Sequence, residues 1–131
     1  MLMINEPIKC TLLGNCYSGK SHFLNCIKKP NECNEDYYPT IGVDFCLHYL
    51  KNKQKVHLWE ISGDPRFYNI ISSYFKAAKF FIVFCDLNSR SSILGLNYWL
   101  DNIREFSNYR NNFFISIVCV DSSKYEGNRS F

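Results

Sequence analysis

The sequence predicts an α/β protein with a mostly parallel sheet, and three observations carry this prediction. Short apolar runs of strand length alternate with stretches whose apolar residues recur at helical spacing. One run, at residues 80–85, is apolar throughout, as in a central strand covered on both faces. The 131 residues suit a single domain with one core. In such a sheet the crossovers are right-handed and ligands bind at the carboxyl ends of the strands.

The first two elements are a strand and the helix that follows it. Ile8–Leu13 is a short apolar run that ends at Gly14. Lys20–Lys29 carries apolar residues at positions 23, 24 and 27, which is helical spacing, and Pro30 marks its end.

Two apolar runs, Val43–Leu50 and Val56–Ile61, flank the polar residues 51–55 and predict a β-hairpin. A turn centred on residues 52 and 53 would set His48 opposite His57. Two histidines without a third ligand make a poor metal site, so a zinc role is not expected.

The rest of the chain predicts two helices and two strands, which makes a five-stranded sheet. Apolar side chains form a helical stripe through residues 67–76, and they recur at steps of three and four through residues 93–103. Phe80–Cys85 is the continuous central strand, and Phe113–Val120 is the last one.

The composition excludes several classes of protein. The net charge of +3 is too small to argue for nucleic-acid binding unless Lys and Arg cluster on one face. The seven cysteines are odd in number and form no C-x-x-C pair, so we predict neither a disulfide framework nor a zinc finger, and we expect a reducing compartment. No secretory signal opens the chain, and no apolar run approaches the ~20 residues that cross a bilayer.

The loop between the first strand and the first helix fits the phosphate-binding pattern G-x-x-x-x-G-K-[ST]. Glycines let backbone N–H groups close around phosphate oxygens, and the helix N-terminus adds a partial positive charge. Lys20 is expected to reach the β- and γ-phosphates of a nucleotide, and the Ser21 hydroxyl to join the shell of a Mg²⁺ ion. A chance glycine-rich turn is the alternative. The predicted phosphate-binding residues are Gly14, Asn15, Cys16, Tyr17, Ser18, Gly19, Lys20 and Ser21.

Two further segments give the chain a resemblance to a known family. Residues 36–45, Asp-Tyr-Tyr-Pro-Thr-Ile-Gly-Val-Asp-Phe, resemble the first switch and effector segment of Rab proteins. Residues 59–67, Trp-Glu-Ile-Ser-Gly-Asp-Pro-Arg-Phe, stand where that family has W-D-T-A-G-Q-E-R-F. From Ile8 to Asp121 the chain therefore resembles a Ras-superfamily small GTPase, most like the Rab branch. The resemblance implies the P-loop NTPase fold of the small GTPases and a GTP/GDP switch of the type that regulates vesicle and membrane traffic.

The resemblance also implies roles for individual residues. Thr40 and the backbone of Gly63 would hold the γ-phosphate and sense the state of the nucleotide. Asp64 stands at the position of the catalytic glutamine, and Asp121 at that of the acid that reads guanine. The implied magnesium ligands are Ser21, Thr40 and Glu60.

The partners implied by the resemblance are Rab-type effectors, an exchange factor and an activating protein. Three of the residues concerned are aromatic, and ordinary core packing is the alternative for them. The implied partner-binding residues are Ile41, Gly42, Val43, Asp44, Phe45, Trp59 and Tyr74.

Several positions depart from the family pattern. Glu60 replaces an aspartate, so Mg²⁺ binding should weaken because a longer carboxylate must fold back. Asp64 replaces the glutamine that orients the attacking water, so intrinsic hydrolysis should be slower than the order of 10⁻⁴ s⁻¹ of unaided family members. Tyr17 replaces a glycine, and its ring must lie outside the loop. Asp121 survives alone from the guanine-reading motif, and a solvated loop acid is its alternative role.

The family's last strand and last helices have no counterpart after Asp121, so we expect a domain that is incomplete at its C-terminus. The last strand would then be an apolar sheet edge, which invites self-association. No cysteine lies near the C-terminus, where Rab proteins are prenylated. We therefore expect a cytoplasmic protein that lies at the periphery of membranes only through a partner.

Two other functions stay open. The chain could be a degenerate pseudo-GTPase that binds Rab-type partners independently of nucleotide, since the glutamine and most of the guanine-reading motif are lost. It could also bind ATP, because the phosphate loop does not select the base.

Overall fold

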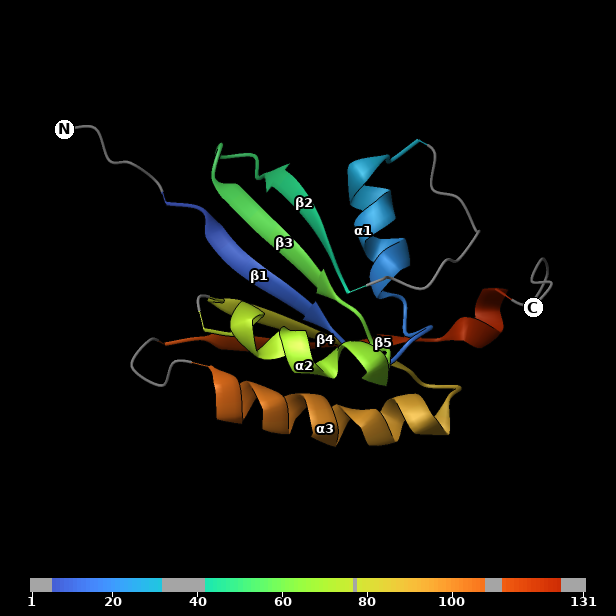
Figure 1. The fold of residues 1–131 in the computed structure, drawn as a ribbon. Coiled ribbons are helices and arrows are strands. Elements are labelled where there is room, and N and C mark those ends of the chain that lie inside the picture. Colours follow the sequence, from blue (N-terminus) through green and yellow to red (C-terminus); the bar gives the residue numbers. More distant parts are fainter. Residues whose placement is uncertain (1–5, 32–41, 77, 108–111, 126–131) are drawn as a thin grey trace.

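The computed structural model describes residues 6–31, 42–76, 78–107 and 112–125, and they form one sheet with helices on both faces (Figure 1). The strand order is β2-β3-β1-β4-β5. Neighbouring strands run parallel except β2 and β3, which form the predicted hairpin. The mostly parallel five-stranded α/β sheet is thus confirmed. The strands are β1 (Ile8–Leu13), β2 (Val43–Tyr49), β3 (Lys55–Ile61), β4 (Phe80–Asp86) and β5 (Phe114–Val120).

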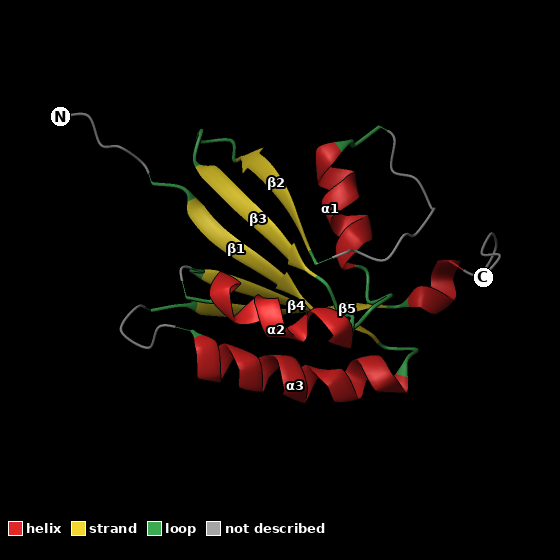
Figure 2. Ribbon diagram, in the orientation of Figure 1, coloured by secondary structure: helices red, strands yellow, loops and turns green. Residues whose placement is uncertain are grey.

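The helices on the two sides of the sheet differ in length and regularity (Figure 2). They are α1 (Lys20–Lys28), α2 (Tyr68–Ile71) and α3 (Arg90–Phe106), with short 3-10 turns at Pro65–Phe67, Ser72–Tyr74 and Ser122–Tyr125. The Ser89 side chain caps α3 by accepting a hydrogen bond from the Ser92 backbone N–H. None of the helices in these described residues combines the length and the hydrophobicity of a membrane-spanning segment.

The single helix predicted over residues 67–76 is wrong, because this stretch folds as two 3-10 turns around the short α2. Asp64 and Pro65 start the first turn, where the Asp64 carboxylate accepts the Arg66 backbone N–H. The Ser73 hydroxyl donates to the Ile70 backbone oxygen at 2.9 Å. Serine side chains that bond to nearby backbone compete with regular helical hydrogen bonding, so the helix ends after one turn.

Alternating side chains of the central strands build one core cluster on each face of the sheet. Leu12 of β1 and Phe84 of β4 pack with Leu24 of α1 on one face. Leu13 and Val83 from the same two strands pack with Trp99 of α3 on the other. Because β1 and β4 are covered on both faces, the loops at their carboxyl ends rest on a rigid base.

The last strand is an edge of the sheet among the described residues, as predicted. In β5, Phe114 is 56% exposed, and Ile115 and Ile117 are also exposed. The segment carries no charged residue, whereas β2 at the opposite edge carries Asp44, which pairs with Lys28 at 2.8 Å.

Candidate functional site

The phosphate-binding pattern folds as a loop that joins the carboxyl end of β1 to the N-terminus of α1. Gly14 and Gly19 have positive φ angles of 141° and 103°, which glycine adopts at little cost. Tyr17 also has a positive φ, of 63°, and its side chain is 61% exposed, so the ring lies outside the loop as expected. Left-handed backbone conformations at these three positions thus shape the turn of the loop.

The Lys20 side chain folds back across this loop. Its Nζ donates to the backbone oxygens of Gly14 at 2.6 Å and Asn15 at 2.8 Å, and it lies 3.3 Å from the Ser18 Oγ. Lys20 is only 4% exposed. Burial lowers the pKa of Lys20 to about 8, against the opposing attraction of Glu60. The loop therefore carries a nearly buried cation at the carboxyl end of the sheet, where a phosphate would have to lie.

Ser21, at the start of α1, contacts Glu60 at the end of β3. The Ser21 Oγ donates a hydrogen bond to the Glu60 Oε1, and Glu60 is 2% exposed. Two of the three side chains implied as magnesium ligands, Ser21 and Glu60, are thus in direct contact. A hydroxyl and a carboxylate are hard oxygen donors of the kind that Mg²⁺ prefers, so the donor set fits this metal.

Gly63, two residues after β3, packs directly against the phosphate loop. A Cβ atom at this position would lie 2.4 Å from the Cys16 backbone nitrogen and 2.7 Å from the Gly14 oxygen. No side chain larger than hydrogen fits there unless the two segments separate. Segments 49 positions apart in sequence are therefore in close backbone contact, which brings Gly63 beside the loop expected to bind phosphate.

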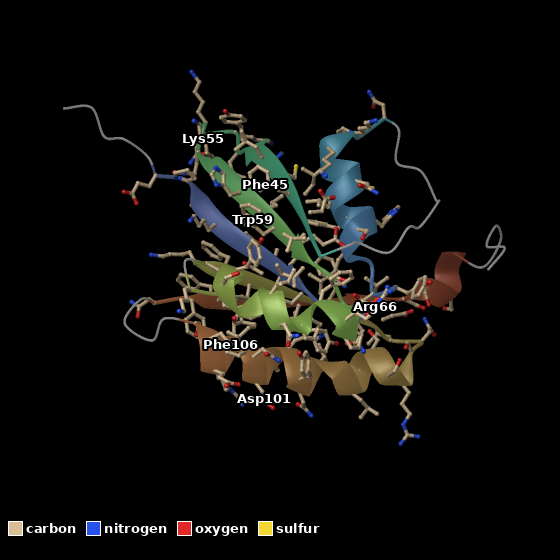
Figure 3. The ribbon with its side chains drawn as sticks, viewed as in Figure 1. Phe45, Lys55, Trp59, Arg66, Asp101 and Phe106 are labelled. Atoms are coloured by element: carbon tan, nitrogen blue, oxygen red, sulfur yellow. The ribbon has the colours of Figure 1, made fainter. Side chains whose placement is uncertain are left out.

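Asp64, at the position of the catalytic glutamine, is bound to Arg66. Its Oδ2 accepts from the Arg66 Nε at 2.9 Å and Nη2 at 2.7 Å. The bidentate hydrogen bonds from Arg66 lower the pKa of the Asp64 carboxyl. The carboxylate is thus ionised and held by its neighbour. Figure 3 places Arg66 near the end of the sheet where the phosphate loop lies.

Asp121 follows β5 directly and is held by its neighbours. Its Oδ1 accepts from the Asn88 Nδ2 at 2.7 Å and from the Ser123 backbone N–H at 3.2 Å. Asp86 joins the loops after β4 and β5 a second time. Its Oδ1 accepts hydrogen bonds from the backbone N–H groups of Asn88 and Ser122. Burial opposes ionisation of Asp86, but these hydrogen bonds outweigh it and lower the pKa. Local sequence patterns do not predict this pairing of two loops, because the residues in contact lie 33 and 36 positions apart in the sequence.

The three aromatic residues proposed to meet partners form one cluster. The ring centroids of Phe45 and Trp59 are 4.5 Å apart, and those of Trp59 and Tyr74 are 5.4 Å apart (Figure 3). Phe45 is 39% exposed and Trp59 is half-buried, whereas Tyr74 packs against the edge of a core cluster. Core packing alone therefore does not explain Phe45. The other described residues of this group are Gly42, which is buried, and Val43 and Asp44, which are half-buried.

Three predictions need comment. Thr40 and Ile41 lie outside the described residues. The two histidines of the hairpin do not face each other, because His48 pairs with Val56 and His57 with Leu47, which places them on opposite faces of the sheet. The cysteine pattern predicted no disulfide framework, and among the described cysteines Cys26 alone is disulfide-bonded. The free thiols in the described part of the chain are Cys10, Cys16, Cys46, Cys85 and Cys119.

Comparison with known families agrees with this geometry. A family model described as Ras of Complex, Roc, domain of DAPkinase matches residues 9–122. This match covers most of the chain and includes the phosphate loop, Glu60, Gly63 and Asp121. The chain therefore belongs to the Roc/Ras superfamily of GTPase domains.

Individual relatives point to the Rab branch of that superfamily. The chain is 33% identical to the Ras-related protein RABA6a of Arabidopsis thaliana over 103 residues, which are 76% of this chain and 44% of the relative. It is 32% identical to the GTP-binding protein YPT1 of Saccharomyces cerevisiae over 102 residues, or 76% of this chain and 49% of the relative. A Ras and EF-hand domain-containing protein of Danio rerio is 35% identical over 74% of this chain and 15% of its own length. The chain thus spans about half the length of its Rab relatives, or less.

The burial of Lys20 predicts a specific pH dependence. Its pKa of about 8 in the folded protein lies below the ordinary lysine value of 10.5, so between these pH values the unfolded chain binds more protons. The free energy of unfolding of the nucleotide-free protein should therefore rise from about pH 8 to about pH 10, relative to a Lys20→Met variant. Urea unfolding of both proteins across this range measures the difference. A difference that stays constant with pH would contradict the depressed pKa.

Proposed function

We propose that this domain is a Rab-like switch that binds GTP and GDP through the phosphate loop, with Mg²⁺. The observation that carries the proposal is Lys20, whose ammonium is held almost out of water by the loop's own carbonyl oxygens. Keeping a cation buried is costly unless a compensating charge or hydrogen bonds are supplied. The loop oxygens supply hydrogen bonds but carry no full negative charge, and an anionic phosphate beside Lys20 would supply that charge.

Each part of the nucleotide has residues proposed to bind it. The loop residues 14–21 offer backbone N–H groups and the N-terminus of α1 to the phosphates. Ser21 and Glu60, with Thr40, would hold Mg²⁺, which when bound neutralises phosphate charge. Asp121 is proposed to read the base. Its anchoring by Asn88 fixes the carboxylate at the carboxyl end of β5.

The switching element is proposed to be the segment from Gly63 to Tyr74. Gly63 touches the phosphate loop, and Tyr74 at the other end contacts Trp59 in the aromatic cluster. A nucleotide that moves Gly63 can thereby alter the surface formed with Phe45. Rab-type effectors, an exchange factor and an activating protein are the proposed partners there, in vesicle traffic at the periphery of membranes.

Nucleotide binding is tested by titration with a fluorescent guanosine diphosphate. Wild type should bind, and Lys20→Ala should weaken binding by about ten- to a hundredfold, because a hydrogen bond to a charged group is worth about 1.5–3 kcal/mol. Lys51→Ala, in the exposed turn of the hairpin, is the matched control and should bind like wild type.

The outcome also separates the alternatives. Competition by adenosine triphosphate as strong as that by guanosine triphosphate would replace the guanine assignment with a general P-loop nucleotide site. If no guanine nucleotide binds, or if Lys20→Ala binds as tightly as wild type, the proposal fails. The nucleotide-independent interaction module would then remain.

Hydrolysis of GTP is proposed to be slow because of the state of Asp64. Its carboxylate is ionised and accepts two hydrogen bonds from Arg66. Unlike glutamine, it has no amide group with which to orient a water molecule. Asp64 lies in the segment proposed to face the γ-phosphate. Its negative charge would repel the negative charge that develops on the attacking water there.

Asp64→Gln should raise the intrinsic rate of GTP hydrolysis by about tenfold or more, because it restores a neutral group of the right length. Asp64→Asn removes the charge and the ion pair without restoring the length, so its gain should be smaller. Single-turnover release of inorganic phosphate from preloaded protein measures both. Equal rates for wild type and Asp64→Gln would show that Asp64 does not limit hydrolysis.

A further inference from the structure

The side chain of Asn15 leaves the phosphate loop and binds α3. Its Nδ2 donates to the Ser91 backbone oxygen at 2.9 Å, and its Oδ1 accepts the Trp99 Nε1–H at 3.0 Å. The partners lie 76 and 84 residues away in sequence. One amide group thus ties the phosphate loop to two turns of the same helix.

The surface of α3 has room for this amide at Gly95. A Cβ atom on Gly95 would lie 2.4 Å from the Asn15 Oδ1. Ser91, Gly95 and Trp99 are spaced four residues apart, so they share one face of α3. Along this face, α3 presents the Ser91 carbonyl, the space beside Gly95 and the Trp99 indole N–H. The Asn15 amide lies against Gly95 and bonds to the groups on either side.

Asparagine is well suited to this position. Trp99 is 1% exposed, and a buried indole N–H without an acceptor would lose the hydrogen bond that it makes to water in the unfolded chain. Ser91 offers an acceptor, so the side chain must both donate and accept. Alanine does neither, and an ionised aspartate would accept from Trp99 but turn its second acceptor oxygen toward the Ser91 oxygen.

The backbone of the same residue holds the phosphate-binding cation. The Asn15 oxygen accepts from the Lys20 Nζ at 2.8 Å and from the Ser18 Oγ at 2.6 Å. The Asn15 side chain therefore fixes the carbonyl that positions Lys20. Loss of the two hydrogen bonds of the Asn15 side chain would let the Asn15 carbonyl change its orientation. Lys20, which is bonded to that carbonyl, would then shift as well.

A second contact brings the Gly63 segment to the same part of α3. The Tyr68 hydroxyl donates to the Gly63 oxygen at 3.2 Å. The Tyr68 ring packs edge-on against Trp99, at 5.6 Å between centroids, and stacks on Tyr98 at 4.8 Å. Trp99 thus contacts residues from both segments that surround the proposed phosphate site.

We propose that Asn15 is a positioning residue, which clamps the phosphate loop to Ser91 and Trp99 of α3 and so makes the hold on nucleotide depend on the Trp99 indole. The inference rests on the proposed nucleotide binding and adds to it a named connection between the phosphate loop and a buried side chain of α3. Asn15 acts through Lys20 and the loop backbone, and Trp99 acts through its hydrogen bond to Asn15.

The test is a double-mutant cycle on the dissociation rate of fluorescent guanosine diphosphate. Asn15→Ala and Trp99→Phe should each raise the rate about five- to tenfold, the equivalent of one hydrogen bond of about 1–1.5 kcal/mol. The double variant should be no faster than the faster single variant, because both changes remove the same bond. Asn97→Ala, an exposed asparagine on α3, is the control and should release nucleotide like wild type.

A spectroscopic signal separates positioning from general loss of stability. The chain has two tryptophans, so a ¹H–¹⁵N spectrum shows two indole signals, and Trp99→Phe identifies one of them. Adding guanosine diphosphate should shift the Trp99 signal in wild type, and Asn15→Ala should move it toward the position of an indole without this acceptor. If Asn15→Ala does not fold, Asn15→Leu, which is similar in size to asparagine and has no hydrogen-bonding group, serves in its place.

The outcomes distinguish the two proposals. Wild type that binds nucleotide, with an unchanged release rate in the Asn15 variant or additive effects in the double variant, overturns the positioning role alone. Wild type that binds no guanine nucleotide overturns the proposed function and this inference with it.

Discussion

The rest of the structure depends on keeping the Lys20 ammonium buried beside the loop that carries it. A cation that is 4% exposed needs acceptors, and the loop supplies the oxygens of Gly14 and Asn15 at 2.6 and 2.8 Å. Those oxygens can face inward only if the loop turns tightly after β1, which requires the positive φ angles at its glycines. The covered central strands then hold the loop in place, so fold and site share one constraint.

Much of this could be predicted from the chain alone, because local chemistry dictates it. The apolar run Ile8–Leu13 is β1 to the residue, since a glycine and a polar loop end it. The single helix expected over residues 67–76 does not form. The Ser73 hydroxyl bonds to the backbone there, which the spacing of apolar residues does not reveal. The Asn15 clamp and the Asn88–Asp121 contact join residues far apart in sequence, and a single sequence gives no sign of them.

The departures from the family pattern have different physical consequences. Glu60 keeps its contact with Ser21 despite its extra methylene, so the donors proposed for Mg²⁺ remain together. Asp64 is instead withdrawn into a pair with Arg66. Under the proposed function, these two differences would weaken cleavage of a nucleotide more than binding of it. The family match covers the segments that carry both differences.

The central claim is that the loop around Lys20 is a nucleotide site. It is tested most directly by identifying the small molecules that are bound to the purified protein. The chain is purified under native conditions with Mg²⁺, denatured, and the released small molecules are identified by ion-exchange chromatography and mass spectrometry. The account predicts guanosine diphosphate or triphosphate in nearly equimolar amount, and its loss from Lys20→Ala prepared in parallel. Protein that carries no nucleotide, or that carries the same amount after Lys20→Ala, would contradict it.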